Sequence, residues 1–517
     1  MTHRKLYESR GAQYRKESET TSFCLYAPNA RSVWLILTAY DTAAPPGQIF
    51  LYLIDDYHGR QMLRTDPISF SVVHIFEVNQ VHSVVHDETA YQWNDQNWLR
   101  QRSQTDPLRS PSSIYEIQPK SWKSSTYKPL KFRQIAAELV SYCQQMGFTH
   151  VEIIGILEHT HQGGRGYQVS NFFAPYRHSG TCDDFEYLID LLHQNNIGVI
   201  LDWIPTHYHR WHQSHFYSTS LHASSSSPWE TRRFLFASAL YYLDRLHIDA
   251  IRFDAISQMI RRQHKDIPSA ISFLHELNQT IHTYYPGVLC IAEETEGYPN
   301  LKTTMSFDLK WNIGWSYDAR NLLRTPYAER PQHWKQKVLD TLNWSRWGPD
   351  KMILTLSHND TDSGEHNKIF LLDNDMRLVV WSYDSYGRCS CTTHVLQIQH
   401  PQFWQYGELD FSLIYEYGLN LVIAYDRGIY NNRRIVIIHN FSNRGYKTYN
   451  IPLPKSDPNV ACVQNVTEIF NTDHPKYSGS GLFENQQLII QRHNDGNMLF
   501  KLTIPPLSTI ILEEILI

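Results

Sequence analysis

Polar side chains suited to acid–base chemistry stand at the ends of short apolar runs in the middle of the chain. Arg252 and Asp254 lie two residues apart in the segment IDAIRFDAI, so a strand would point both side chains to one face. Glu293 follows the next apolar run, and Asp202 lies in an earlier one. Carboxylates and an arginine gathered in one place are costly to desolvate, so this spacing indicates a functional site.

Two carboxylates held close together can cleave a glycosidic bond with retention of configuration. One is an ionised nucleophile and the other donates a proton, at a separation of about 5–5.5 Å. The guanidinium of Arg252 favours ionised Asp254, and partial burial with a neighbouring negative charge favours protonated Glu293. A salt-bridge network that closes the end of a barrel is the competing interpretation, and spacing alone leaves both open.

These residues require elements that bring distant segments together. Short apolar runs recur at 114–117, 151–156, 199–204, 248–253, 288–292, 305–309, 352–356 and 395–398. Most are roughly 35–50 residues apart, which leaves room for a helix and two loops. Eight such units predict a (β/α)8 (TIM) barrel, in which the loops after the strand C-termini carry the chemistry.

One of the intervening helices follows directly from its residues. Thr181 and Asp184 form a capping-box pattern at its start. The apolar positions at i, i+3, i+4 and i+7 are Phe185, Leu188, Ile189 and Leu192. The pattern predicts an amphipathic helix that ends before Gly198.

Both ends of the chain have the texture of β-structure. The first part contains alternating runs such as SFCLYA and VWLIL, and the last part contains LVIAY and RRIVIIHNF. We therefore predict an α/β protein with an N-terminal β-sandwich at 1–108, the barrel at 109–414 and a C-terminal β-sandwich at 415–517.

Composition and charge exclude several classes of protein. The 517 residues carry 47 Lys+Arg and 52 Asp+Glu, a net charge of −5, which gives no case for a nucleic-acid or anionic-membrane partner. The seven cysteines include no CxxC pair, and the N-terminus has no apolar signal region. We expect a cytoplasmic protein with reduced thiols. No stretch approaches the ~18 apolar residues of a membrane span.

Two further features have competing interpretations. Aromatic residues make up 13% of the chain; a large core absorbs most of them, and a groove with stacking faces for sugars is the alternative. The histidines of HYHRWH (His207, His209, His212) and EHTH (His159, His161) suggest a metal. With 27 histidines in the chain such clusters arise by chance, so we expect neither a metal nor a cofactor.

The motifs together resemble one enzyme family. They include SIYEIQPKSWK, GFTHVEIIGILEH, GYQVSNFFAPYRHSGTCDDF, GVILDWIPTH, IDAIRFDAI, IAEET, FDLKWNIGW and LTLSHND. The chain resembles the 1,4-α-glucan (glycogen) branching enzymes of the α-amylase superfamily, glycoside hydrolase family 13, in a divergent and shortened form. The terminal segments LYESRGAQYR and FNTDHPKYSGSG resemble the family's carbohydrate-binding-like N-terminal domain and its closing β-domain.

The resemblance implies specific roles. Asp254 matches the family's nucleophile, Arg252 its charge partner, and Glu293 its general acid/base. The implied substrate-binding residues are Asp202, which holds the arginine, His207, which binds the donor-site sugar, Tyr167, which stacks on that sugar, and His358, which hydrogen-bonds its hydroxyls.

The third carboxylate of the family's site is missing here. Asn359 stands at its position, and an amide cannot stabilise positive charge in the transition state. The loss of one charged hydrogen bond corresponds to a roughly tenfold to hundredfold lower rate. Asp360 is an alternative carboxylate next to it. The stretch between LSHND and the expected eighth strand is also shorter than in the family, and Arg165 replaces a tryptophan.

Three functional hypotheses follow. The first is a branching-type transglycosylase that cleaves an α-1,4 linkage by a retaining double displacement and re-forms an α-1,6 linkage. The second is a catalytically inactive glucan-binding or regulatory homologue, and the third is a weak α-glucan hydrolase. In each case the expected partner is an α-glucan such as glycogen, amylose or starch, and we expect a monomer.

Overall fold

The computed structural model describes residues 5–38, 43–75, 80–110, 112–122, 130–159, 164–206, 228–314, 317, 325, 329, 350–355, 382–383, 389–390, 412–417, 420–430, 432–452, 463–475, 479–485, 488–492 and 498–516. The chain forms two compact units. The first comprises Met1–Pro107, Ser113–Gln144 and Phe148–Trp311; the second comprises Leu108–Ser112, Gln145–Gly147 and Asn312–Ile517. The three-domain division at 1–108, 109–414 and 415–517 stays a prediction.

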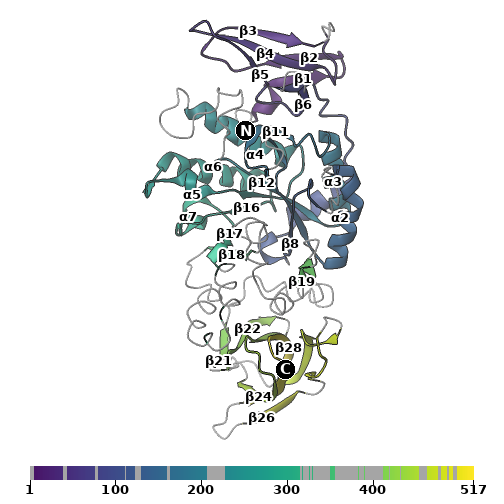
Figure 1. Cartoon of the computed structure of the whole chain (residues 1–517), viewed down its shortest axis with the longest axis vertical. Helices are drawn as coiled ribbons and strands as arrows, with labels where there is room; N and C mark the ends of the chain where they lie inside the picture. Colours follow the sequence, from purple (N-terminus) through teal and green to yellow (C-terminus); the bar gives the residue numbers. More distant parts are fainter. Residues whose placement is uncertain are drawn as a thin grey trace. The chain divides into compact units, whose positions relative to one another are not determined.

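The N-terminal part of the first unit is all-β, as predicted (Figure 1). After the 3-10 turn η1 (Leu6–Glu8), its strands are β1 (Gly11–Arg15), β2 (Thr20–Cys24), β3 (Ala30–Leu37), β4 (Ile49–Asp56), β5 (Gln61–Arg64), β6 (Ser71–Ile75) and β7 (Gln80–Val84). Strands β1 and β2 form a hairpin, and the others form a sheet in the order β3-β4-β7-β6 with β5 on β4. Phe50, Tyr52 and Ile54 are buried in its core.

Six parallel strands of the first unit lie side by side in the order β17-β16-β13-β12-β9-β8. They are β8 (Ile114–Ile117), β9 (His150–Ile153), β12 (Gly198–Trp203), β13 (Ala250–Phe253), β16 (Leu289–Ala292) and β17 (Leu309–Asn312). The helices between them are α2 (Phe132–Met146), α3 (Cys182–Gln194), α4 (Pro228–Asp244), α5 (Ile256–Ile260), α6 (Pro268–Tyr284) and α7 (Leu301–Met305). This alternation is that of the predicted TIM barrel.

Short elements complete the barrel region. They are α1 (Gln96–Gln104), η3 (Pro107–Arg109), the hairpin β10 (Leu157–His159) and β11 (Val169–Pro175), and the pair β14 (Arg261–Arg262) and β15 (Lys265–Asp266). The predicted strand at 305–309 is wrong, because Met305 ends helix α7 and the strand begins at Leu309. The seventh predicted run overlaps β18 (Lys351–Leu354), and the eighth, 395–398, lies outside the described residues.

Helix α3 forms as its sequence predicts. The backbone N–H of Asp184 donates to Thr181 Oγ1 at 3.2 Å, and the N–H of Thr181 donates to Asp184 Oδ2 at 3.1 Å. The predicted apolar face is fully buried, with Phe185, Leu188, Ile189 and Leu192 all at 0% exposure. Each such side chain contributes about 1.5–3 kcal/mol when buried, so this face fixes the helix against the sheet.

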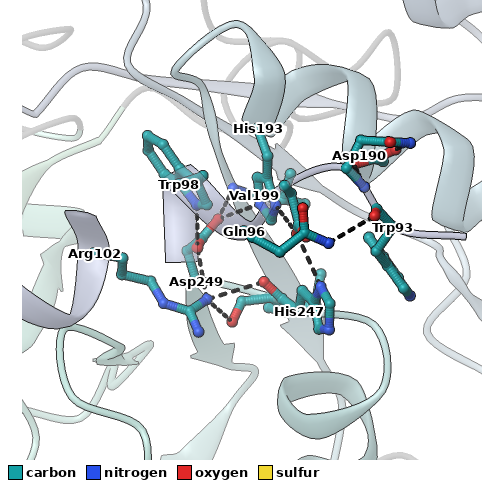
Figure 2. A network of polar contacts seen from close by, with 12 residues as sticks. Trp93, Gln96, Trp98, Arg102, Asp190, His193, Val199, His247 and Asp249 are labelled. Atoms are coloured by element: carbon teal, nitrogen blue, oxygen red, sulfur yellow. Dashed lines mark hydrogen bonds and ion pairs between the residues drawn. The ribbon is translucent and has the colours of Figure 1, made fainter. Parts of the chain in front are cut away.

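A buried polar network lies at the N-terminal ends of strands β12 and β13 (Figure 2). Asp249 Oδ1 accepts hydrogen bonds from Trp98 Nε1 and Arg102 Nη1, both at 2.8 Å. Asp249 Oδ2 accepts from the N–H of Val199 at 2.7 Å and contacts His193 Nε2 at 2.9 Å. Trp98 and Arg102 belong to α1, so this network ties that helix to the barrel.

The two nitrogens of His193 each face a carboxylate, Asp249 at one side and Asp95 Oδ2, at 2.9 Å, at the other. Burial alone would lower the pKa of His193, but the two carboxylates raise it above its usual value. The pKa of Asp95 is lowered to about 2, because hydrogen bonds from His193 and His247 outweigh the effect of burial. The two carboxylates therefore favour the imidazolium form of His193.

The second unit contains the C-terminal antiparallel strands. They are β21 (Ser412–Tyr417), β22 (Val422–Tyr430), β23 (Arg433–Asn440), β24 (Tyr446–Pro452), β25 (Val463–Asn471), β26 (Ile489–Arg492), β27 (Met498–Ile504) and β28 (Ser508–Leu516), with the short pair β19 (Ser382–Tyr383) and β20 (Cys389–Ser390) before them. They form a sheet in the order β21-β22-β23-β28-β25 and a second in the order β24-β27-β26. Both sheets contribute to one apolar core that includes Val436, Ile438, Ile451 and Phe500. This is the predicted C-terminal β-sandwich. None of the described helices is long and apolar enough to cross a membrane.

Candidate active site

Arg252, on strand β13, is the centre of a buried cluster of carboxyl groups. Its side chain is fully buried, and strand pairing places it directly beside Asp202 of β12. Nη1 donates to Asp202 Oδ1 and, at 2.8 Å, to Asp254 Oδ1. Nη2 lies 2.9 Å from Glu293 Oε2. The structure thus brings together the four residues that the sequence places at three strand ends.

The guanidinium is held on its remaining sides as well. The ring of Trp311 lies under it, with Arg252 Cζ 4.2 Å from the ring centroid, a cation–π contact. Glu152 Oε1 lies 4.0 Å from Arg252 Nε. Because the aromatic face and the carboxylates enclose it, Arg252 has a fixed orientation toward Asp254 and Glu293.

The backbone positions Glu293 relative to Asp254. The N–H of Ala255 donates to Glu293 Oε2 at 2.8 Å. The N–H of Glu293 donates to the carbonyl of Phe253 at 3.1 Å, and the N–H of Ile256 donates to the carbonyl of Glu293 at 3.1 Å. Ala255 has a φ of 48°, a left-handed conformation that is strained for a residue with a Cβ. The chain accepts this strain at the turn that joins the two acidic residues.

The carboxyl groups outnumber the cation that they share. Burial raises the pKa of Asp254, Arg252 opposes this, and Asp202 and Glu293 add to it, so the pKa of Asp254 rises to about 8. A hydrogen bond between the side chains of Asp254 and Glu293 contributes to the rise. Asp254 therefore holds a proton more strongly than an ordinary aspartate, although Arg252 favours its ionised form. The sequence predicts only the effect of Arg252, because it does not show how many acidic groups surround the cation.

Two glutamates of the cluster were missed in the sequence. Glu116 of β8 and Glu152 of β9 are direct partners across the parallel strands, and Glu152 is 2% exposed. Burial, then the charge of Glu116, raises the pKa of Glu152, with Arg252 opposing. The available signal was a glutamate inside each of two apolar runs, IYEI and HVEI, at the same place before the strand end.

Of the remaining predicted site residues, the structure describes only Tyr167. Tyr167 is partly exposed, and its pKa is raised well above the usual value by burial and by the charges of Asp202 and Asp254, which places it beside the cluster. His207, His358 and Asn359 lie outside the described residues.

Of the histidines considered as metal ligands and the alternative carboxylate Asp360, the structure describes only His159. His159 stacks on Tyr176 at a ring distance of 4.0 Å, and its Nδ1 contacts the carbonyl of Leu157 at 2.9 Å. The others, His161, His207, His209, His212 and Asp360, lie outside the described residues. His159 is thus held within the core, against an aromatic ring.

The described cluster has the parts that acid–base and nucleophilic chemistry require. Two acidic groups lie side by side, one cation is fixed beside both, and each acidic group is almost fully buried, at 6% for Asp254 and 7% for Glu293. One group can attack an electrophilic carbon while the other supplies a proton to the leaving atom.

The chain is similar to known proteins along nearly its whole length. Residues 117–234 match the family model of the alpha amylase catalytic domain, and residues 418–514 match that of the alpha amylase C-terminal all-beta domain. The chain is 28% identical to the 1,4-alpha-glucan branching enzyme GlgB of Rhodopirellula baltica, over 99% of this chain and 83% of that protein. It is 30% identical to that of Trichormus variabilis, over 72% of this chain and 59% of that protein.

Solved structures share the fold. A putative alpha amylase from Salmonella typhimurium aligns with a TM-score of 0.61 at 16% identity, covering 97% of this chain and 99% of that one. A pullulanase from Anoxybacillus sp. LM18-11, solved with maltotriose, aligns with a TM-score of 0.64 at 14% identity, covering 99% of this chain and 87% of that one. At these identities the likeness shows the fold alone.

Proposed function

Because the chain belongs to the α-amylase superfamily (glycoside hydrolase family 13) and is similar to its 1,4-alpha-glucan branching enzymes, we propose that it is a branching-type glycosyltransferase. It cleaves an α-1,4 linkage of a glucan and re-forms an α-1,6 linkage. The observation that carries this proposal is that Asp254 and Glu293 form ion pairs with the two terminal nitrogens, Nη1 and Nη2, of the same guanidinium, that of Arg252. Retaining glycosidases need such a pair of acidic groups.

Each acidic group has one role in each half-reaction. Asp254 attacks the anomeric carbon of the donor sugar while Glu293 gives its proton to the departing O4, so the C1–O4 bond breaks and a covalent ester forms. Glu293 then takes the proton from an acceptor O6–H, the O6 attacks the same carbon, and the bond to Asp254 breaks. Two inversions give net retention, and no cofactor is needed.

The proposed mechanism uses one protonation state of the acid pair. The reaction requires the proton on Glu293 and a negative charge on Asp254. The 2.8 Å bond from Arg252 Nη1 favours the charged form of Asp254, and the N–H of Ala255 holds the Glu293 carboxyl in place. Because catalysis needs only one of the two ways to place this proton, activity depends on the charge balance around Arg252.

For the sugar-binding positions we carry over the family's pattern. Tyr167 stacks on the donor sugar, His207 and His358 hydrogen-bond its hydroxyls, and Asp202 fixes Arg252. Asn359 stands for the third carboxylate and lowers the rate, because its amide carries no negative charge. The expected cytoplasmic location and monomeric state belong to this proposal.

Asn359 also favours a second candidate function. With the third carboxylate replaced, the chain is an α-glucan-binding protein that retains the acid pair without turnover. A weak α-glucan hydrolase, in which water takes the place of the acceptor hydroxyl, is the remaining alternative. All three share the α-glucan ligand and differ in what happens to the linkage.

One assay separates these functions. The full chain is incubated with amylose, the iodine spectrum is followed, and α-1,6 linkages are counted after enzymatic debranching. New branches without new reducing ends support the transferase, and reducing ends alone support the hydrolase. Neither product, together with retardation in a glycogen-containing gel, supports the binding protein. Absence of all three results contradicts every form of the proposal.

Two variants assign the chemistry. Asp254→Asn keeps the size of the side chain and removes the nucleophile, so we expect branch formation to fall by at least about 1000-fold. Asn359→Asp restores the family's carboxylate, and we expect the rate to rise by about 10-fold to 100-fold. If Asn359→Asp changes neither rate nor product, the third carboxylate does not limit this protein.

A further inference from the structure

A group of metal-ligating side chains lies on the opposite side of the sheet from Arg252. In the part of the chain that the structure describes, His282, Cys290 and Asp308 bring one nitrogen, one sulfur and one oxygen within 4.8 Å of one another. We propose that these three residues bind a zinc-like divalent cation, at a site separate from the acid pair.

Three different elements deliver the ligands. His282 lies near the end of helix α6, Cys290 lies in strand β16, and Asp308 immediately precedes strand β17. Cys290 is paired with Ile251, one position before Arg252, and side chains alternate between the faces of a strand. The thiol therefore points away from the barrel interior, toward the helix layer where His282 lies.

The site is held by contacts that do not use the thiol. The N–H of Asp308 donates to the carbonyl of Cys290 at 2.9 Å, and the N–H of Cys290 donates to Asp308 Oδ2 at 2.7 Å. His282 Nε2 lies 2.8 Å from the same oxygen. Two of the ligating side chains are thus already oriented toward each other, with a fully buried thiol beside them, which is the kind of support that metal ligands receive from their surroundings.

The donor set matches the chemistry of zinc. Imidazole nitrogen, thiolate sulfur and carboxylate oxygen are the three ligand types that Zn²⁺ takes in proteins, at about 2.0–2.3 Å. Three protein ligands leave a fourth position for water. The side chain of His282 is 34% exposed, which gives the cation a route from solvent.

Binding requires two proton movements that can be balanced without another reactant. The Cys290 thiol releases its proton to solvent as the metal–sulfur bond forms. The hydrogen between His282 Nε2 and Asp308 Oδ2 passes to solvent, and the imidazole binds the metal through Nε2 while Nδ1 carries the one proton of the ring. The cation replaces the direct contact between His282 and Asp308. A plain ion pair between those two residues would need no thiol.

Co²⁺ is the probe that tests for thiolate ligation. It is added to the full, reduced chain, and the near-ultraviolet sulfur-to-cobalt charge-transfer absorption is followed during titration, with Zn²⁺ used to displace it. We expect the band in the wild type and its loss in Cys290→Ser. Since the chain has seven cysteines, the buried Cys143 of α2 provides the matched control, and Cys143→Ser should keep the band.

A second pair of variants protects the test from a folding failure at the buried cysteine. His282→Gln changes a partly exposed ligand and should weaken Zn²⁺ affinity by about 100-fold or more. It should lower the melting temperature of the metal-free protein less than Cys290→Ser does, because Cys290 is fully buried. His275→Gln, two turns earlier on α6, is its control and should leave affinity unchanged, since His275 contacts Ser306 instead.

Two outcomes overturn the proposal. One is a wild-type protein that shows no thiolate band at saturating Co²⁺. The other is a band of unchanged affinity in both Cys290→Ser and His282→Gln, which would assign the cation to another thiol. Neither outcome depends on glucan chemistry, so the metal site and the proposed function stand or fall separately.

Discussion

The two ends of the barrel strands differ in the ratio of buried acidic to basic groups. At the N-terminal ends, Asp249 is matched by Arg102 and by His193, which also pairs with Asp95. At the C-terminal ends, one Arg252 faces the carboxyl groups of Asp202, Asp254, Glu293 and Glu152. The first cluster is balanced, and the second has an excess of acid.

The difference separates stability from function. In the balanced cluster the pKa of Asp249 is lowered, because the charge of His193 and its hydrogen bond outweigh burial, so the ionised groups stabilise the fold. In the acid-rich cluster the pKa of Asp254 is raised to about 8, so ionisation costs stability. Groups held in an unfavourable charge state are typical of active sites, and in TIM barrels these lie at the C-terminal ends of strands.

The largest effect is expected from Asp249→Asn. The amide has nearly the same shape, but it leaves the buried His193 and the Arg102 guanidinium without their shared anion. Breaking a buried ion pair from one side costs about 3–5 kcal/mol, and denaturant unfolding should show this loss. Asp56→Asn is the control, because that carboxylate pairs with Arg60 at the surface. If Asp249→Asn leaves the free energy of unfolding unchanged, the cluster at the N-terminal strand ends does not stabilise the fold.

Asp254→Asn should act in the opposite direction. Removing one acidic group from the acid-rich cluster relieves its repulsion, so we expect the free energy of unfolding at neutral pH to rise by roughly 0.5–2 kcal/mol while activity is lost. Denaturant unfolding of wild type and variant measures the change. A loss of stability in Asp254→Asn would remove the contrast between the two ends.

The pH dependence of stability tests the balanced cluster through His193. Its pKa is raised in the folded protein despite burial, so its contribution is complete below the ordinary value of about 6.5 and is lost as pH rises through the folded pKa. We expect the difference in unfolding free energy between wild type and His193→Gln to be largest below that value and to shrink as the pH rises. Taking the difference cancels the contribution of Asp254. A constant difference from about pH 5 to about pH 9 would show that folding leaves the pKa of His193 unchanged.

The smallest change is expected for Glu152→Gln. The carboxyl of Glu152 has a raised pKa and lies 4.0 Å from Arg252 Nε, and an acid with a raised pKa lowers stability as pH rises above its ordinary value of about 4.3. Gln cannot ionise, so stability above neutral pH should rise by at most about 1 kcal/mol. If denaturant unfolding instead shows that Glu152→Gln lowers the free energy of unfolding by more than about 1 kcal/mol, the negative charge of Glu152 stabilises Arg252 in the folded protein.

The barrel could be predicted because its strands are apolar runs bounded by polar residues. The strand predicted at 305–309 is wrong, because helix α7 extends to Met305. Ser306, between the apolar residues Met305 and Phe307, adopts a left-handed conformation (φ 59°) at the end of that helix. Apolar content alone does not distinguish the last turn of a short helix from the first residues of a strand. The strand therefore begins later, at Leu309.

The candidate site could be predicted where several residues share strand ends, as Arg252, Asp254 and Glu293 do. The N-terminal network could not, because Asp95, His193 and Asp249 are single polar residues in distant segments with no common motif. The raised pKa of Asp254 could not be predicted either, since it depends on how many acidic groups are buried together. Glu152 shows this, because inside an apolar run it counted only as part of a strand.

The backbone contacts of residues 253–256 with Glu293 have a consequence for how such a protein diverges. Three hydrogen bonds, through Phe253, Ala255 and Ile256, fasten the segment that carries Asp254 to Glu293. The backbone itself therefore sets the separation of the two acidic groups. If the proposed function holds, mutation elsewhere in the barrel can change which sugar chains are accepted without disturbing the acid pair.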